Sequence, residues 1–446
     1  MPTQAAKARA LAGQFGKAID GTFAPAGLPI AELAGRFGTP FYLYDGGLVL
    51  DRVRRVRAAL GTEIAYSIKA NPSLAICQLL AAEPGVGAEA ASAGELALAL
   101  EAGFRPEDLM FAGPGKTDDE LERLVAAGIL ADNVESLNEI DRLAVVASRV
   151  APERRTGVNL RLNPGAQLLG AQMRMGGTAS QFGIDETELD AAVERVRSHP
   201  NLVLRGIHVY TATQVFKAEP LLEHCRSVLD LALATAERSG GPLEVVDLGG
   251  GFGVPYFEKD GELDLDGFGR AFRELLAGYA RDPRLTGCRF VFELGRYLTA
   301  HAGIYVTRVV DTKTTRGRAF AITDGGMSHH LTATGNMGQV FRKAFPLLNL
   351  SRLDGAAAGM RPVTVAGPLC TPLDTFGTDV ELVDPRIGDL IGVFYSGAYG
   401  YSASNLGFLS HPAPAEVLLW RGEARLLRPA GEPEDVLRGQ AGLPIR

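Results

Sequence analysis

Short apolar runs alternate with longer segments of helical periodicity between residues 62 and 295. The segments SAGELALALEAG (92–103) and TDDELERLVAAG (117–128) repeat apolar residues at the i, i+3, i+4 spacing and end on glycine, as amphipathic helices do. Eight strands with helices between them predict a (β/α)8 TIM barrel of the α/β class. An open Rossmann sheet fits less well, because the glycine run at 249–251 lacks the GxGxxG register. The expected strands are residues 62–70, 85–90, 108–113, 130–134, 156–164, 203–211, 242–251 and 289–295.

The pattern changes after residue 300, where helical periodicity almost disappears. The early run TPFYLYD (39–45) is expected to pair with the sheet that follows there. We therefore expect two domains: a barrel at residues 46–298, and a β domain formed by residues 1–45 together with 299–446. Short runs bounded by turn residues predict that the second domain is all-β, of Greek-key or sandwich type, with strands at 304–313, 318–326, 361–367, 390–397 and 415–422.

Composition narrows the class of protein. Of the 446 residues, 46% are hydrophobic and 22% are charged, a balance typical of a globular protein with a large core. The formal net charge of −7 argues against nucleic acid as a partner, because phosphate binding needs clustered lysine and arginine. The four cysteines lie far apart with no CxxC pair, so we expect no metal site and no disulfide framework. These cysteines, together with the lack of a signal-peptide pattern or an 18-residue apolar run, predict a cytoplasmic protein without membrane contact.

Chemically capable residues stand where several of the predicted barrel strands end. In a (β/α)8 barrel the carboxyl ends of the strands form the face at which chemistry takes place. Each of these residues, taken alone, also has a purely structural explanation. A functional interpretation therefore depends on the chemistry that they provide together. They are Lys69, Glu89, His208, Tyr210, the run Gly249–Gly251, Glu293 and Arg296.

Lys69 closes the otherwise apolar strand YSIKANP. A single lysine at a strand end most often extends its amine into water. The alternative is a desolvated amine that condenses with a carbonyl cofactor. The run Gly249–Gly251 is either a tight turn or, late in a barrel, a set of exposed amides before a helix that cradles a phosphate. In the second case Arg296 could add a bidentate clamp.

Glu293 and Tyr210 also admit two interpretations each. Glu293 either pairs with Arg296 or faces a pyridine nitrogen, whose protonated form a carboxylate stabilises. Tyr210 either packs in the core or provides a face on which an aromatic ring stacks. Pyridoxal 5′-phosphate requires an amine, a phosphate-binding site, a surface on which its ring can stack, and an anionic partner for its pyridinium nitrogen. We therefore predict this cofactor.

A series of motifs then occurs in the order found in one enzyme family. The motifs are YSIKAN, ASAGELALALEAG, FAGPGKTDDEL, NVES, RLNP, SQFGID, DLGGGFG, FELGRYL, GPLC and GAYG. Over roughly residues 38–420 the chain thereby resembles the fold-type III, alanine-racemase-like decarboxylases that depend on pyridoxal phosphate, the group of diaminopimelate and ornithine decarboxylases. The resemblance implies a homodimer in which the barrel of one subunit and the β domain of the other share each active site.

The resemblance also implies roles for individual residues. Lys69 resembles the lysine that binds the cofactor, Glu293 the partner of the pyridine nitrogen, and Cys370 the active-site cysteine supplied by the second subunit. An amino-acid racemase of this fold would set an arginine against the ring nitrogen, and a non-catalytic homologue would be expected to have lost cofactor residues. The cofactor-binding residues implied are Lys69, Glu89, His208, Tyr210, Thr213, Gly249, Gly250, Gly251, Glu293, Gly295, Arg296 and Tyr399.

Departures from the commoner family pattern concern the substrate. The stretch HVYTATQ has Tyr210 and Thr213 where diaminopimelate decarboxylases have histidine and serine in HxHxGS, and the RPxLY motif is absent after DGGMSHH. Thr371 follows Cys370 where diaminopimelate decarboxylases have glutamate and ornithine decarboxylases aspartate. The pattern is more similar to the L-glutamyl-[acyl-carrier protein] decarboxylase branch, whose substrate is an amino acid tethered to an acyl-carrier protein.

Thr371 predicts a substrate whose distal end carries no positive charge. A distal ammonium group, as in ornithine, lysine or diaminopimelate, needs a buried anion beside it. If Asp374 or Asp324 replaces the missing carboxylate, the alternative function is a diaminopimelate decarboxylase or another decarboxylase of a free amino acid. An acidic carrier protein could dock on basic surface such as Arg52, Arg54 and Arg55 or Arg342 and Lys343. Substrate contacts are predicted for Thr371, Asp374, His329, Arg342 and Phe408.

Overall fold

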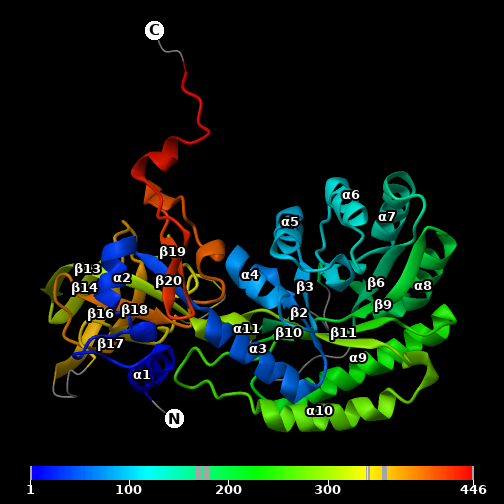
Figure 1. Cartoon of the computed structure of the whole chain (residues 1–446), viewed down its shortest axis with the longest axis horizontal. Helices are drawn as coiled ribbons and strands as arrows, with labels where there is room; N and C mark the ends of the chain where they lie inside the picture. The colour runs from blue at the N-terminus through cyan, green and yellow to red at the C-terminus, as the bar shows by residue number, and fades with distance from the viewer. Residues whose placement is uncertain are drawn as a thin grey trace. The chain divides into compact units, whose positions relative to one another are not determined.

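The computed structural model describes residues 3–165, 173–174, 180–337, 339, 342–353 and 359–443. The chain forms two compact units, which Figure 1 shows coloured along the chain. The β unit comprises Met1–Val49, Pro255–Asp260 and Thr299–Arg446, and the barrel unit comprises Leu50–Val254 and Gly261–Leu298. The chain therefore passes between the two units more than once.

The barrel unit is built on parallel strands, eight of them in the described residues, that close into a ring. Consecutive strands are neighbours around this ring, which closes where β12 pairs with β2. Each strand overlaps one of the predicted ranges, so the predicted (β/α)8 barrel is confirmed. The strands are β2 (Glu63–Ser67), β3 (Val86–Ala90), β4 (Leu109–Phe111), β5 (Ala131–Val134), β6 (Thr156–Asn163), β9 (Leu202–His208), β11 (Val245–Gly250) and β12 (Arg289–Leu294).

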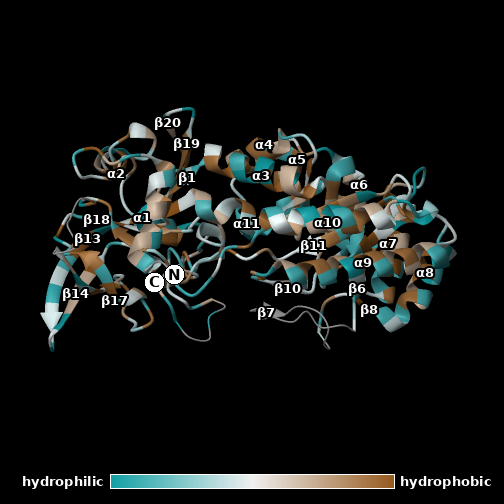
Figure 2. Cartoon of the chain, turned by 90° about the horizontal axis from the view of Figure 1, so that it is seen from below, coloured by the Kyte–Doolittle hydropathy of each residue, from teal (hydrophilic) through white to brown (hydrophobic). Residues whose placement is uncertain are grey.

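Helices connect these strands and lie around them (Figure 1). Thr117 forms a reciprocal capping box with Glu120, and Ser92 and Ser136 each accept a backbone amide at the start of a helix. In Figure 2 these helices carry both hydrophobic and hydrophilic residues, as expected for helices with one packed face. The helices are α3 (Gly46–Leu60), α4 (Leu74–Ala81), α5 (Ala93–Ala102), α6 (Asp118–Ala127), α7 (Leu137–Val150), α8 (Leu189–Ser198), α9 (Ala218–Ser239), α10 (Leu265–Tyr279) and α11 (Arg296–Thr299).

Three short strands supplement the barrel. β8 (Ile184–Asp185) pairs with the end of β6, and β7 (Met173–Arg174) pairs with β10 (Ala212–Thr213). No helix among the described residues has both the length and the hydrophobicity needed to cross a membrane.

Apolar side chains fill part of the barrel interior. Ala65, Met110, Val245 and Val291, from four different strands, form a buried cluster against which Leu130 packs. Each of the four strand residues lies before the last residue of its strand. The carboxyl ends of the strands are thereby left to the polar residues that follow this cluster in sequence.

The β unit is a sheet in which β13 (Gly303–Thr315) is a shared partner. The first half of β13 pairs with β1 and β18, and its second half pairs with β14 after a register shift between Val309 and Asp311. β1 (Phe41–Asp45) lies antiparallel to β13 and parallel to β19, so the prediction that the early run joins this sheet is confirmed. The remaining elements are α1 (Gln4–Phe15), α2 (Ile30–Phe37), β14 (Arg318–Thr323), β15 (Leu347–Asn349), β16 (Met360–Ala366), β17 (Thr375–Val383), β18 (Leu390–Phe394), β19 (Ala415–Trp420) and β20 (Glu423–Arg428).

Three strands of this sheet, β15, β17 and β20, were not predicted. β20 is largely exposed, so its sequence shows no alternation between a buried and a solvent face. β17 contains Gly377 and shifts register where it pairs with β16, which interrupts the strand pattern. β15 is only three residues long.

Candidate active site

Lys69 lies in the single 3-10 turn Ile68–Ala70 that follows β2. Its Nζ donates hydrogen bonds to Oε1 of Glu89 (3.1 Å) and to Oε1 of Glu293 (3.2 Å). The same nitrogen lies 5.8 Å from the centroid of the Tyr210 ring. Its side chain is 42% exposed, whereas both carboxylates are buried. The amine therefore stands at the carboxyl ends of β2, β3 and β12 with one side open.

Glu293 is the most extensively bonded carboxylate of this group. Its Oε1 also accepts a hydrogen bond from the Ser67 hydroxyl (2.7 Å), and its Oε2 lies 3.1 Å from Nε2 of His208. His208 is the last residue of β9 and is fully buried. Residues predicted at four different strand ends, Lys69, Glu89, His208 and Glu293, are thus brought into one cluster.

The charges of the cluster differ between its two glutamates. Burial raises the pKa of Glu89 to about 8, and the negative charge of Glu293 adds to the effect. Burial would also raise the pKa of Glu293, but Lys69 and the hydrogen bond from His208 hold it well below its usual range. Burial would lower the pKa of His208, yet the nearby Asp247 carboxylate and the bond to Glu293 raise it. At neutral pH Glu293 is therefore ionised while Glu89 keeps a proton.

The same cluster has the spacing of a metal site, which the sequence did not predict. Glu89, His208, Asp247 and Glu293 place potential ligand atoms within 4.8 Å of one another. Metal ligands must be deprotonated, whereas burial raises the pKa of Glu89 to about 8. The Lys69 amine also lies beside two of these carboxylates. The cluster is therefore better suited to an organic cofactor than to a cation.

The glycine run has a different setting from the one expected. Gly249 and Gly250 are buried within β11, and the next helix, α10, begins only at Leu265. A Cβ atom on Gly250 would lie 1.9 Å from the Glu293 carbonyl oxygen, and one on Gly251 would lie 2.1 Å from that of Ala212. Gly249 and Gly251 also have positive φ angles of 64° and 81°. Glycine is thus required here by close backbone packing, which brings the run next to Thr213.

Gly295 and Arg296 follow directly at the end of β12. A Cβ atom on Gly295 would lie 2.7 Å from the Cβ of Ala70. Gly295 therefore allows β12 to approach the turn that carries Lys69. Arg296 is the first residue of α11.

Cys370 and Thr371 lie in the turn between β16 and β17 of the β unit. Cys370 is exposed, and Thr371 is half-buried, with its Oγ1 accepting a hydrogen bond from the Leu373 amide (3.3 Å). The neighbouring Asp374 is 2% exposed, and its carboxylate accepts hydrogen bonds from the amides of Met327 (2.6 Å) and Leu369 (2.8 Å). Asp374, predicted to contact substrate, therefore stabilises the turn that carries Cys370.

The remaining predicted residues of the β unit have varied environments. Burial lowers the pKa of His329 to about 4, so its imidazole is neutral, and its Nε2 lies 3.0 Å from the Pro412 carbonyl oxygen. Arg342 donates to the side-chain oxygen of Asn336 (2.8 Å), and Phe408 is 42% exposed. Tyr399 has a φ of 52°, a conformation that costs energy for a residue with a side chain.

Several residues of the site were missed by sequence reasoning. Ser67, which bonds Glu293, lies two residues before Lys69, and this spacing on a strand was an available signal. Asp247 is a charged residue inside the apolar run of β11, which was a second signal. Arg161 forms a buried ion pair with Glu135 (2.6 Å), and no local pattern relates these two residues.

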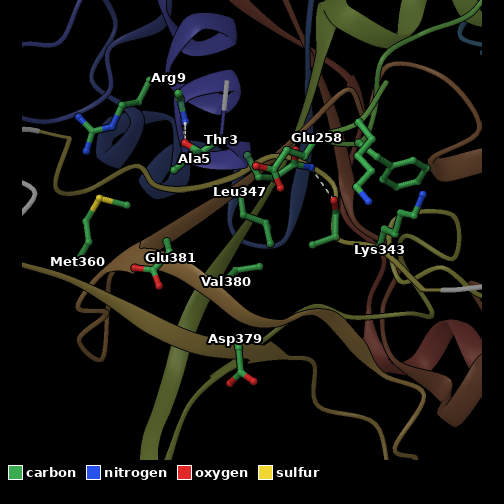
Figure 3. A pocket seen from close by; sticks show the side chains of 15 residues that line it. Thr3, Ala5, Arg9, Glu258, Lys343, Leu347, Met360, Asp379, Val380 and Glu381 are labelled. Carbon is green, nitrogen blue, oxygen red and sulfur yellow. Dashed lines mark hydrogen bonds between the residues drawn. The ribbon is translucent and has the colours of Figure 1, made fainter. Parts of the chain in front are cut away.

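A separate hollow lies within the β unit (Figure 3). It has a volume of about 1020 Å³ and is lined by the first turns of α1, residues 257–259, residues 343, 344 and 347, Met360, and residues 379–381 of β17. Lys343, from the predicted docking surface, lines it, and its Nζ lies 5.1 Å from the Phe257 ring centroid. The lining mixes Arg9 and Lys343 with Glu258 and Glu381, so it favours no single class of ligand.

Comparison with known proteins agrees with this site. Residues 47–300 match the family described as "Pyridoxal-dependent decarboxylase, pyridoxal binding domain". The chain is 41% identical to the L-glutamyl-[BtrI acyl-carrier protein] decarboxylase of Niallia circulans, over 92% of this chain and 96% of that protein. It is 30% identical to the diaminopimelate decarboxylase of Zymomonas mobilis, over 94% of this chain and 97% of that one.

Solved structures are also similar. The crystal structure of diaminopimelate decarboxylase from Helicobacter pylori, complexed with L-lysine, superposes with a TM-score of 0.81 at 28% identity, covering 92% of this chain and 98% of that one. The chain therefore belongs to the pyridoxal-dependent decarboxylases of fold type III. It is a carboxy-lyase that uses pyridoxal phosphate, and the resemblance found in its motifs is confirmed.

The residues present fit this cofactor. The Lys69 amine lies at the mouth of the barrel beside Glu293, whose carboxylate stays ionised. An amine can bind the carbonyl group of the cofactor, and an ionised carboxylate can stabilise a proton on its ring nitrogen. Nδ1 of the buried His208 has no hydrogen-bond partner in the part of the chain that is described, so the site contains a polar atom that a ligand could satisfy.

Proposed function

We propose that the enzyme decarboxylates an acidic amino acid whose side-chain carboxyl is joined to an acyl-carrier protein, such as a glutamyl thioester. The observation that carries the proposal is the neutral Thr371 beside Cys370, together with 41% identity to a decarboxylase named for a carrier-bound glutamyl substrate. The alternative, a diaminopimelate decarboxylase, corresponds to relatives at lower identity.

The charge of the β unit supports a substrate with an uncharged distal end. Asp374 is held by two backbone amides. Asp324 accepts hydrogen bonds from the Thr39 and Thr307 hydroxyls at 2.5 and 2.7 Å and from the Arg308 amide at 2.9 Å. Both carboxylates that could replace the missing acidic residue therefore already have partners. A γ-carbonyl requires only hydrogen-bond donors, such as the Thr371 hydroxyl.

Pyridoxal phosphate supplies the electron-poor ring that accepts the electron pair released as CO₂ leaves. Lys69 would hold this cofactor through its amine, and the ionised Glu293 would keep a proton on the ring nitrogen. Cys370, from the second subunit, or Lys69 would return a proton to Cα of the substrate. The residues proposed to complete the cofactor site are Glu89, His208, Tyr210, Thr213, Gly249, Gly250, Gly251, Gly295, Arg296 and Tyr399.

We infer a homodimer, because the family resemblance assigns Lys69 and Cys370 of one site to different subunits. Lys69 belongs to the barrel unit and Cys370 to the β unit, which is compatible with sharing of this kind. None of the four cysteines forms a disulfide. This supports a protein that works in a reducing cytoplasm.

Between the two candidate docking surfaces, the charges favour Arg342 and Lys343. Arg54 forms an ion pair with Glu83 (2.5 Å), and Arg55 lies 3.6 Å from Asp266. Arg342 and Lys343 are both exposed, and their described contacts are with uncharged groups, the Asn336 side chain and the Phe257 ring, so their charges can attract an acidic carrier protein.

A product assay tests the proposal. CO₂ release is measured from a glutamyl-carrier protein thioester, an amide-capped glutamate, and free glutamate, meso-diaminopimelate, lysine and ornithine. We expect turnover of the carrier-bound and capped substrates and weak or no turnover of the free diamino acids. Efficient decarboxylation of free diaminopimelate would overturn the substrate assignment and favour the alternative function.

Charge reversal separates docking from chemistry. The variant Lys343→Glu, at an exposed residue outside the predicted substrate contacts, should raise KM for the carrier-bound substrate and leave that for the capped amino acid unchanged. The matched control is Arg54→Glu, which reverses a charge already engaged with Glu83. An equal effect of both variants on the carrier-bound substrate would argue against this docking surface.

A further inference from the structure

Two loops at the mouth of the barrel run side by side. The first, residues 209–215, follows β9, and the second, residues 249–254, begins within β11. Main-chain hydrogen bonds join them, from the Val215 amide to the Gly251 carbonyl (3.0 Å) and from the Gly253 amide to the Val215 carbonyl (2.9 Å). These loops carry Tyr210, Thr213 and the glycine run of the proposed cofactor site.

Gln214 fastens the two loops through its side chain. Its Nε2 donates to the Val254 carbonyl (3.1 Å), and its Oε1 accepts from the Val254 amide (3.0 Å). The carboxamide therefore uses both of its polar ends on the main chain of one residue. Gln214 is 8% exposed and has a φ of 60°, in the left-handed region that favours glycine. Residues whose backbone is held in a strained conformation cluster at active sites and ligand clamps.

The second loop is also held beyond Val254. Residues Pro255–Asp260 are counted with the β unit, where Lys7 of α1 donates to the carbonyls of Pro255 (3.0 Å) and Phe257 (2.6 Å). Gln4 donates to the carbonyl of Tyr256 (3.0 Å). The segment that follows the glycine run is thus held by Gln214 at Val254 and by α1 at residues 255–257.

We propose that Gln214 is a positioning residue for cofactor binding, which fixes the glycine run against the loop that carries Tyr210 and Thr213. The proposal rests on the proposed function, in which these residues hold the cofactor. Without the carboxamide, the loops keep their main-chain bonds but lose the side-chain connection at Val254. Cofactor binding must then order the two loops, which are already ordered in the wild type, and the affinity falls as a result.

The test measures affinity for pyridoxal phosphate in the cofactor-free protein, followed by absorbance on titration. Gln214→Met keeps the length of the side chain and removes both hydrogen bonds, and we expect about tenfold weaker binding. The matched control is Asn201→Leu. Asn201 donates to the Ala144 carbonyl (2.7 Å) and the Ser148 hydroxyl (3.0 Å), just before β9 at the opposite end of the barrel. The Asn201→Leu variant should be less stable than the wild type but should bind pyridoxal phosphate with unchanged affinity.

Gln214→Glu provides a second readout that a merely structural role would not produce. A protonated carboxyl can replace both hydrogen bonds, whereas an ionised one repels the Val254 carbonyl oxygen. Relative to wild type, its affinity should therefore recover as the pH falls, and that of Gln214→Met should not.

The outcomes distinguish this inference from the proposed function. Wild-type affinity in Gln214→Met, or a loss no greater than in Asn201→Leu at equal destabilisation, would overturn the role of Gln214 alone. If the wild-type protein itself fails to bind pyridoxal phosphate, the cofactor site as proposed is wrong.

Discussion

The substitution Glu89→Gln should stabilise the cofactor-free protein at pH 7. The buried carboxyl has a pKa of about 8 in the folded protein, compared with 4.5 for an unperturbed glutamate. Folding at pH 7 therefore requires Glu89 to take up a proton that the unfolded chain has released. At about 1.4 kcal/mol for each pH unit above 4.5, this requirement costs about 3 kcal/mol. Glutamine resembles the protonated carboxyl and avoids that cost.

The sign of the effect with pH follows from the same pKa. A raised pKa gives stability that is fully present below the unfolded value and is lost as pH rises toward the folded value. The advantage of Glu89→Gln should therefore shrink on acidification and vanish below pH 4.5, where both states of the wild type hold the proton.

Urea unfolding at pH 5 and pH 7, at fixed protein concentration, measures this effect. Far-ultraviolet circular dichroism follows the helices, most of which lie in the barrel unit, while Trp420, the only tryptophan, lies in β19 and reports on the β unit. The control Glu293→Gln should be destabilising, because it removes an ionised acceptor of bonds from Ser67 and Lys69. Destabilisation by Glu89→Gln at pH 7, or an equal gain at both pH values, would refute the assignment of the proton to Glu89.

Further predictions concern activity and pH. Glu293→Gln should retain cofactor but lose about 100-fold or more in decarboxylation rate, because the ring nitrogen loses its anionic partner; unchanged turnover would contradict this role. Mixing inactive Lys69→Ala with inactive Cys370→Ala should restore up to about 25% of wild-type activity through shared sites, whereas no recovery after confirmed subunit exchange would mean that both act within one chain. Burial lowers the pKa of His224 to about 4 and that of His330 to about 3, so stability should fall as the pH drops below about 6.5, by up to about 1.4 kcal/mol per pH unit for each histidine. Urea unfolding of His224→Gln at several pH values should show that its stability falls less steeply with pH than that of the wild type. An equally steep fall would contradict the lowered pKa of His224.

Much of the fold could be predicted because the barrel is encoded locally. Each barrel strand is a short apolar run separated from the next by helical periodicity, and the right-handed βα succession then fixes the order of strands. β20 could not be predicted in this way, since an exposed edge strand carries no buried face. β13 was predicted as one strand, but its two halves pair with different partners, which depends on contacts distant in sequence.

The site was predictable where a residue type is unusual for its place. Lys69 and Glu293 stand out as charged residues in apolar runs. Ser67 does not, because its bond to Glu293 spans 226 positions and exists only once the barrel closes. Asp374 was predicted as a substrate contact because it could replace the carboxylate missing at residue 371. Its bonds to the amides of Met327 and Leu369 exist only in the folded turn, so the sequence did not indicate them.

The central claim is that the site is organised around Lys69, and a lysine that is buried elsewhere in the barrel provides a direct comparison. Lys116 is 1% exposed at its side chain and contacts Asp132 (2.8 Å) and Glu139. Burial would lower the pKa of Lys116, but these two carboxylates raise it, and its enclosed amine is out of reach of a cofactor. Lys69 has one side open at the carboxyl end of β2.

The decisive measurement is borohydride reduction of the cofactor-loaded protein, followed by proteolysis and mass-spectrometric mapping of the modified lysine. The account predicts a reduced pyridoxyl adduct on Lys69 and none on Lys116, and no adduct in the Lys69→Ala variant. An adduct on Lys116 or on any other lysine, or a protein that binds no cofactor, would contradict the account.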